Sequence, residues 1–264
     1  MTILEAVILG IIQGLTEFLP VSSSGHLEIG TVLLGVNTKD NLLFSIVVHG
    51  ATAFSTVVIF RKDIGQIVID LLKFEANESL HFSLKILLSM IPVGIVGVLF
   101  EDQIEAFFGG RIVLVGSMLI VTGLLLLFTQ FSKSSDKEVS YPKAIIIGLA
   151  QAIAIMPGIS RSGSTISTAI LLGVDREKAA RFSFLMVLIP ILGATLIKVK
   201  HLYEAPELSA DISGLALGLG FVAAFISGLL ACKWMISIVK KGKLIYFAIY
   251  CFTIGALAII ASLL

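Results

Sequence analysis

Residues 13–26 read QGLTEFLPVSSSGH, and they interrupt a segment that is otherwise apolar from residue 3 to residue 36. A helix needs about 20 apolar residues to cross a hydrocarbon core of ~30 Å, and the interruption leaves two halves that are each too short. Pro20 also ends a helix, because proline has no backbone N–H to donate. This stretch therefore predicts a re-entrant helix–loop–helix hairpin, which enters a membrane and leaves it on the same side.

Residues 141–173 form a second interrupted segment, whose polar part reads PGISRSGST at 157–165. An offset of 138 residues (148 − 10), without a gap, lays this segment over the first and continues through LLGV at 33–36 and 171–174. The polar identities are Gln13 with Gln151, Ser22 with Ser160, Ser24 with Ser162, and Gly25 with Gly163. Chance does not readily give such identities between apolar sequences, so we predict an internal repeat. Repeat 1 covers about residues 3–131, and repeat 2 about 141–263, of one membrane domain at 1–264.

The composition also indicates a membrane protein. Hydrophobic residues make up 57% of the chain and charged residues 14%, with a mean hydropathy of +1.04, whereas soluble domains average roughly 45–50% apolar and about 25% charged residues. The net charge of +1 gives no basis for nucleic-acid binding. Cys232 and Cys251 both lie in apolar stretches, so the sequence offers neither a disulfide framework nor a CxxC metal site.

Six further apolar stretches are long enough to span a bilayer. They lie at 42–60, 84–100, 112–131, 182–198, 213–232 and 244–263. Three of them separate the two hairpins, and because three is odd, the second hairpin must enter from the side opposite to the first. We therefore predict an all-α polytopic membrane protein with six transmembrane helices and two re-entrant hairpins in two inverted-topology repeats. This architecture places a site near the bilayer midplane.

The polar loops assign the two sides of the membrane. Loops near 61–85, 132–143, 174–181 and 233–243 fall on one side by this count, and they hold most of the 19 lysines and arginines. The positive-inside rule makes that side cytoplasmic and both termini external. The long loop at 61–85 has room for an amphipathic surface helix, which would leave the number of crossings unchanged.

Amide and charged side chains lie within both interrupted segments. Gln13 and Glu17 are four residues apart, so they share one helix face and point into one cavity. Arg161 stands between two serines and near glycines that allow a tight turn. A charge at membrane depth is costly and usually faces a functional cavity, so this arginine needs an anionic partner.

These groups suit the binding of an oxyanion. Loop N–H groups and the positive N-terminal ends of the following half-helices would converge on a negative centre. The hydroxyl groups available there are those of Ser22, Ser23, Ser24, Ser160, Ser162, Ser164 and Thr165. Arg161 could bind two phosphate oxygens at once. Phosphoryl transfer also needs a group that carries a proton, and His26, at the start of its half-helix, is the candidate.

Each of these residues also has a structural interpretation. Gln13 could satisfy backbone groups freed by the helix break instead of binding a ligand or metal, and Glu17 could be only the ion-pair partner of Arg161. Serines are common where membrane helices pack closely. We interpret His49, in the middle of the stretch 42–60, as pore-facing or bonded in the core rather than catalytic.

The two polar motifs together resemble those of the undecaprenyl-diphosphate phosphatases of the bacitracin-resistance type. The resemblance covers essentially the whole chain, including IPVGIVGVLFEDQIE at 91–105 and RFSFLMVLIP at 181–190. It implies a hydrolase of the bacterial plasma (inner) membrane that removes the terminal phosphate from a C55 isoprenoid diphosphate. The product is the lipid carrier for peptidoglycan and other cell-wall polymers, and the site would open to the external side. The resemblance also implies a divalent cation, Mg²⁺ or Ca²⁺.

Position by position, the resemblance implies roles for individual residues. Glu17 would be the essential acidic residue, Ser23 and His26 the candidates for nucleophile or proton shuttle, and Arg161 the phosphate clamp. His26, oriented by Glu17, would activate water or Ser23 or attack phosphorus itself, and the sequence leaves these routes open. The substrate-binding residues would be Gln13, Ser22, Ser24, Gly25, Ser160, Ser162, Gly163 and Thr165.

The metal prediction is limited by Gln13, which occupies a position where the family uses Glu or Gln. Glu17 and Gln13 are the predicted metal ligands, and with one carboxylate between them the cation would be held largely by substrate phosphates and water. The predicted partners are a polyprenyl diphosphate and membrane lipids but no nucleic acid, and a homodimer is left open. The rival interpretation is a transporter or flippase for polyprenyl phosphate or a small anion, since inverted repeats also suit alternating access.

Overall fold

The computed structural model describes residues 1–36, 38–100, 103–104, 106–107, 111–133, 135–204 and 212–263, apart from the side chains of 38–42, 198 and 201–204. This part of the chain is helical and contains no strand. Its helices are α1 (Ile3–Phe18), α2 (Ser23–Leu34), α3 (Thr38–Ile59), α4 (Arg61–Leu71), α5 (Glu78–Leu99), α7 (Ile112–Phe128), the 3-10 helix η1 (Thr129–Phe131), α8 (Tyr141–Ile153), α9 (Arg161–Leu171), α10 (Arg176–Met186), α11 (Leu188–Glu204), α12 (Gly214–Lys240) and α13 (Ile245–Leu263).

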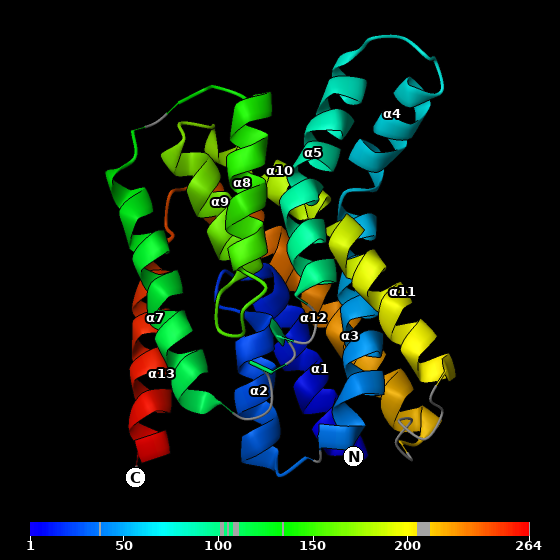
Figure 1. The fold of residues 1–264 in the computed structure, drawn as a ribbon, viewed down its shortest axis with the longest axis vertical. Coiled ribbons are helices and arrows are strands. Elements are labelled where there is room, and N and C mark those ends of the chain that lie inside the picture. The colour runs from blue at the N-terminus through cyan, green and yellow to red at the C-terminus, as the bar shows by residue number, and fades with distance from the viewer. Residues whose placement is uncertain are drawn as a thin grey trace.

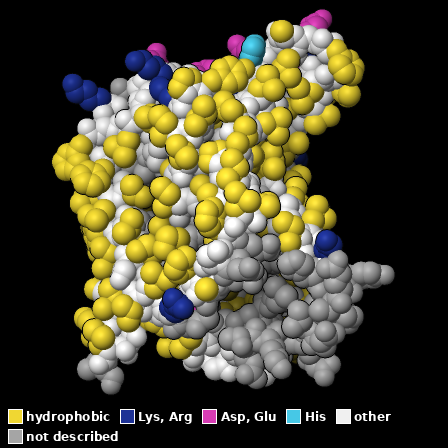
Figure 2. All heavy atoms as spheres, in the orientation of Figure 1, with side chains coloured by type: hydrophobic (Ala, Val, Ile, Leu, Met, Phe, Trp, Pro, Cys, Tyr) yellow, Lys and Arg dark blue, Asp and Glu magenta, His cyan; other side chains and the backbone are white. Residues whose placement is uncertain are grey.

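Five helical stretches in the described part are long and apolar enough to cross a membrane. They are Glu78–Leu99, Ile112–Phe131, Arg176–Ile197, Gly214–Lys240 and Ile245–Leu263. The pair α3 and α4, bent by 74°, makes a sixth if it counts as one span. Figure 2 shows hydrophobic side chains across the visible face, whereas most charged side chains in view lie near its upper edge. The prediction of a multi-pass helical membrane protein is therefore confirmed.

The structure differs from the sequence prediction at two helix boundaries. Much of the expected loop at 61–85 is helical, because α4 covers Arg61–Leu71 and α5 begins at Glu78. The stretch expected at 182–198 begins earlier, at Arg176, where Asp175 caps α10 by accepting from two backbone N–H groups. Hydropathy alone missed these turns because they carry charged residues.

Both interrupted segments fold as hairpins, α1 with α2 and α8 with α9 (Figure 1). The first enters from the end of the molecule that holds the N-terminus and the second from the opposite end, and their loops lie at mid-height (Figure 1). In the first loop, Ser22 caps α2 by accepting from the N–H of Gly25 at 3.3 Å. In the second, Ser160 caps α9 by accepting from the N–H of Gly163 at 3.0 Å. The two loops therefore begin their half-helices in the same way.

Each hairpin packs its first helix against a long helix from the other half of the chain. Helix α1 lies along α12, and α8 lies along α5. Gly14 and Gly148 allow these close approaches, because a Cβ on either would collide with the backbone of Ala224 or Ser89, respectively. The two halves therefore interlock, and the hairpin loops are fixed against both of them.

The main core lies behind the hairpin loops. Phe18, at the end of α1, packs on Phe184 of α10 with ring centroids 5.9 Å apart. Val115 and Leu119 of α7 and Ile166 of α9 belong to the same fully buried cluster. This packing holds the two loops in contact with each other.

Candidate active site

The loops of the two hairpins meet at an ion pair between Glu17 and Arg161. Arg161 Nη2 donates to Glu17 Oε1 at 2.8 Å, although the two residues are 144 positions apart in the sequence. The Glu17 side chain is 5% exposed and that of Arg161 is 25% exposed. The arginine therefore has the anionic partner that the sequence required, and it also keeps an exposed portion that a ligand can reach.

The other carboxylate oxygen of Glu17 is also bonded. Oε2 accepts from Gln13 Nε2 at 2.9 Å and from the hydroxyl of Ser23 at 2.5 Å. Gln13 is fully buried, and its Oε1 has no hydrogen-bond partner among the described residues. Four of the predicted site residues therefore form one connected polar group around the Glu17 carboxylate.

His26 has partners that the sequence did not predict. Its Nδ1 lies 2.8 Å from the carbonyl oxygen of Ser22, and its Nε2 lies 2.9 Å from the hydroxyl of Tyr250 on α13. Because a carbonyl can only accept, Nδ1 carries the proton in the neutral ring and Nε2 accepts from the tyrosine. The expectation that Glu17 orients His26 is therefore wrong, since α13 places Tyr250 against this ring. The two rings also stack, with centroids 5.6 Å apart.

His49 lies beside Glu17, although the sequence analysis gave it no part in catalysis. Its Nε2 is 4.0 Å from Glu17 Oε2, and its side chain is 21% exposed. Its Nδ1 lies 2.8 Å from the carbonyl oxygen of Ser45, one turn earlier in α3. A histidine in the middle of an apolar helix was the only sequence signal, and that signal does not identify its neighbour.

The remaining hydroxyl groups divide into structural and accessible ones. Ser22 and Ser160 are buried helix caps, and Thr165 is buried and donates to the carbonyl of Arg161 at 2.9 Å. Ser24 and Ser162 are half-buried, and each hydroxyl pairs with that of its cap residue, at 3.3 and 3.2 Å. The hydroxyl of Ser164 is buried and has no partner among the described residues. Ser24 and Ser162 are therefore the serines best placed to reach a ligand.

The two predicted binding glycines act in the contact between the loops. A Cβ on Gly25 would lie 3.1 Å from Gly158 Cα, and a Cβ on Gly163 would lie 3.3 Å from Pro20 Cβ. Larger residues would push the hairpins apart. Residues 101, 102 and 105 of the stretch at 91–105 lie outside the described residues.

The donor set of the polar centre meets only part of what a divalent cation requires. No group of three or more His, Cys, Asp or Glu side chains that could hold a metal occurs among the described residues. Glu17 and the unpartnered Oε1 of Gln13 are hard oxygen donors four residues apart on α1. They fit a cation such as Mg²⁺ only as two of its ligands, with phosphate oxygens and water supplying the rest.

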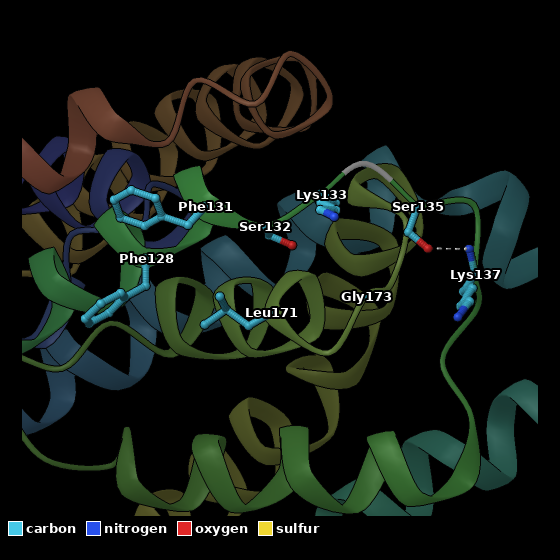
Figure 3. Close-up of a pocket in the computed structure, with 8 residues that line it drawn as sticks. All are labelled: Phe128, Phe131, Ser132, Lys133, Ser135, Lys137, Leu171 and Gly173. Carbon is cyan, nitrogen blue, oxygen red and sulfur yellow. Dashed lines mark hydrogen bonds between the residues drawn. The ribbon is translucent and has the colours of Figure 1, made fainter.

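Two cavities lie away from this centre. One of about 550 Å³ is lined by Phe128, Phe131, Leu171, Gly173 and the loop that carries Lys133 and Lys137 (Figure 3). The other, of about 890 Å³, is lined by residues of α4, α5 and the loop before α8. Neither includes Glu17, Arg161 or His26, so the hairpin centre is identified by its polar contacts rather than by these cavities.

Known proteins match this chain over nearly its whole length. A protein from Christiangramia forsetii is 58% identical over 262 residues, which are 98% of this chain and 98% of that protein. One from Bacteroides fragilis is 56% identical over 259 residues, or 98% of this chain and 97% of the relative. One from Bacteroides thetaiotaomicron is 54% identical over 264 residues, covering both chains completely. All three are named undecaprenyl-diphosphatase.

The family described as Bacitracin resistance protein BacA matches residues 6–257. The matched range contains both hairpins and every residue of the polar centre. The chain therefore belongs to the bacitracin resistance protein BacA family.

Proposed function

We propose that this chain is an undecaprenyl-diphosphatase of the bacterial inner membrane. It hydrolyses undecaprenyl diphosphate to undecaprenyl phosphate and inorganic phosphate, which recycles the lipid carrier for cell-wall synthesis and gives resistance to bacitracin. The observation that carries the proposal is the Glu17–Arg161 ion pair, with Ser23 bonded to the same carboxylate, where two hairpins meet. The names of the relatives, which match over nearly the full length, support the same activity.

The membrane topology is part of the proposal. Six crossings and two re-entrant hairpins form two inverted repeats, with the basic end of the molecule cytoplasmic and both termini external. The entry of the hairpins from opposite ends supports this arrangement (Figure 1). The site opens to the external side, where the diphosphate reaches it while the polyprenyl tail remains in the bilayer. A homodimer is not required, because the polar centre is built within one chain.

Phosphate binding depends on Arg161 and the starts of two half-helices. The guanidinium has N–H groups beyond the one that bonds Glu17, and they can bind two phosphate oxygens. The N-termini of α2 and α9 add backbone N–H groups and a favourable helix dipole. The hydroxyls of Ser24 and Ser162 are half-buried beside these termini and are available to the same oxygens.

Hydrolysis breaks the P–O bond between the two phosphates, adds the elements of water to the terminal one, and leaves the lipid monophosphate. The short Ser23–Glu17 bond favours Glu17 as the base that takes a proton from Ser23, or from a water in its place. His26 holds its Nδ1 proton on Ser22, so its Nε2 can exchange a proton with the leaving phosphate once Tyr250 releases it. Direct attack by His26 would require the same release.

A bound divalent cation would neutralise charge on the phosphates as they separate. Glu17 and Gln13 would hold it from α1. The residues of the chain would then keep the carboxylate, the serine and the arginine in fixed relation to the terminal phosphate.

The test is release of inorganic phosphate from a polyprenyl diphosphate by the purified protein in detergent, with and without a chelator. Arg161→Ala should reduce release to below about 1% of wild type, because preorganised charge stabilisation is lost, while the protein remains folded. The control is Lys178→Ala, which breaks a solvent-exposed ion pair with Glu138. Full activity of the Arg161 variant would refute the clamp, and a wild type that binds lipid but releases no phosphate would favour transport.

A further inference from the structure

His49 brings a second imidazole to the polar centre, from a helix that belongs to neither hairpin. Its Nδ1 lies 2.8 Å from the carbonyl oxygen and 3.3 Å from the hydroxyl of Ser45, which anchors that side of the ring and directs Nε2 toward Glu17. The 4.0 Å separation between Nε2 and Glu17 Oε2 exceeds a hydrogen bond by about 1 Å. A small movement of either side chain would close it.

The need for such a partner follows from the charges at the site. Among the described residues, the lysine or arginine partner of Glu17 in an ion pair is Arg161. A diphosphate adds negative charge beside the same guanidinium and competes with the carboxylate for it. Ser23, which bonds the other oxygen, is itself a candidate to lose its proton during the reaction. Two of the partners that hold Glu17 in place are therefore occupied when the substrate is bound.

We propose that His49 is a positioning residue for Glu17: its Nε2 donates to the carboxylate and holds it in place when Arg161 binds the substrate's phosphates. The hydroxyl of Ser45, 3.3 Å from Nδ1, can donate to that nitrogen, so the neutral ring can carry its proton on Nε2 and donate it to Glu17. No covalent bond to His49 forms. The inference rests on the proposed function, because it assigns His49 a part in that reaction.

The experiment compares His49→Leu with His49→Gln in phosphate release from a polyprenyl diphosphate. Leucine removes the donor and should lower kcat about tenfold or more, as expected for a lost hydrogen bond to a charged group. KM should stay within about twofold of wild type, because His49 contacts Glu17 and not the substrate. Glutamine places a donor nitrogen at a similar reach and should restore kcat to within about threefold of wild type.

The matched control is His81→Leu. His81 bonds Tyr141 at 2.7 Å instead of a residue of the site, so its removal should leave kcat unchanged. If His49→Leu does not fold, His49→Asn replaces it, since its shorter amide does not reach Glu17 and should also lower kcat.

Three results would overturn the proposal. They are an unchanged kcat in the leucine variant, a glutamine variant as impaired as the leucine variant, and a raised KM with normal kcat. A wild type that releases no phosphate would instead overturn the proposed function. An active wild type, an inactive Arg161→Ala and a fully active His49→Leu would reject only this inference.

Discussion

The two hairpins have similar loops but carry different chemical groups. At the offset of 138 residues (148 − 10), the capping serines and the glycines in the first turn after them, Gly25 and Gly163, are the same in both. The chemically active positions differ, with Glu17 over Ile155, Ser23 over Arg161 and His26 over Ser164. Glu17 contacts Arg161, which aligns with Ser23, so two copies of the first hairpin would bring a carboxylate against a serine, and two copies of the second an isoleucine against an arginine. Divergence at these positions is what allows a carboxylate from one loop to pair with a guanidinium from the other.

The same contrast holds for the two buried glutamines, which occupy matching positions in the two copies of the repeat. Gln13 donates to Glu17 at 2.9 Å, whereas the Nε2 of Gln151 lies 3.8 Å from the sulfur of Met90. Neither Oε1 has a partner among the described residues. Similar backbone geometry therefore gives one glutamine a charged partner and the other none.

The largest effect is expected when the first hairpin is made like the second at its carboxylate. Glu17→Ile should lower phosphate release by more than about 100-fold, because it removes the proposed base. It also leaves Arg161 without its ion-pair partner, which should lower the free energy of unfolding by about 3 kcal/mol. Phosphate release and thermal unfolding in detergent measure the two effects, and wild-type activity would remove Glu17 from the mechanism.

The paired glutamines allow a sharper version of the comparison. Gln13→Leu should lower activity about tenfold, because it removes a hydrogen bond to a charged group. Gln151→Leu, the matched change in the second hairpin, should leave activity within about twofold of wild type. Equal losses in both variants would show that the glutamines serve the packing of the hairpins and not Glu17.

A smaller effect is expected from the contact that α13 makes to the first hairpin. Tyr250→Phe keeps the stacked ring but removes the hydroxyl that bonds His26, and it should change phosphate release by about three- to tenfold. Tyr246→Phe is the matched control on the same helix, where the side chain is 63% exposed. Identical rates for wild type and Tyr250→Phe would exclude a role for this hydroxyl.

The smallest effect is expected at an exposed ion pair outside both hairpins. Lys178 lies beside Glu138 and holds the pKa of that carboxyl below its usual value of 4.5. The pair therefore contributes to stability above pH 4.5, and the contribution is lost as the pH falls through the lowered pKa. Lys178→Ala should lower the thermal unfolding temperature only slightly at pH 7, because exposed ion pairs are weak, and should leave activity unchanged. Thermal unfolding at pH 7 and at pH 3 should show the larger difference at the higher pH.

Local sequence signals were sufficient to predict where the two interrupted helices break. Proline and serine after Phe18 end α1 and begin α2, and the same kinds of residue separate α8 from α9. Asp175 is also a local signal, since an aspartate before a helical run can accept from its first N–H groups, as it does at α10. The sequence predicted the ends of helices that begin with charged turns less accurately, because such turns resemble loops.

The sequence by itself determined that the chain is an apolar, multi-pass helical protein with two polar interruptions, because hydropathy and helix-breaking residues act over a few turns. It also indicated which residue types would meet there. Only the tertiary structure decided their partners: Glu17 with Arg161 and His49, and His26 with Tyr250, 224 positions away in the chain. Such pairs depend on how whole helices pack and rotate against one another, and no local pattern of residues contains that information.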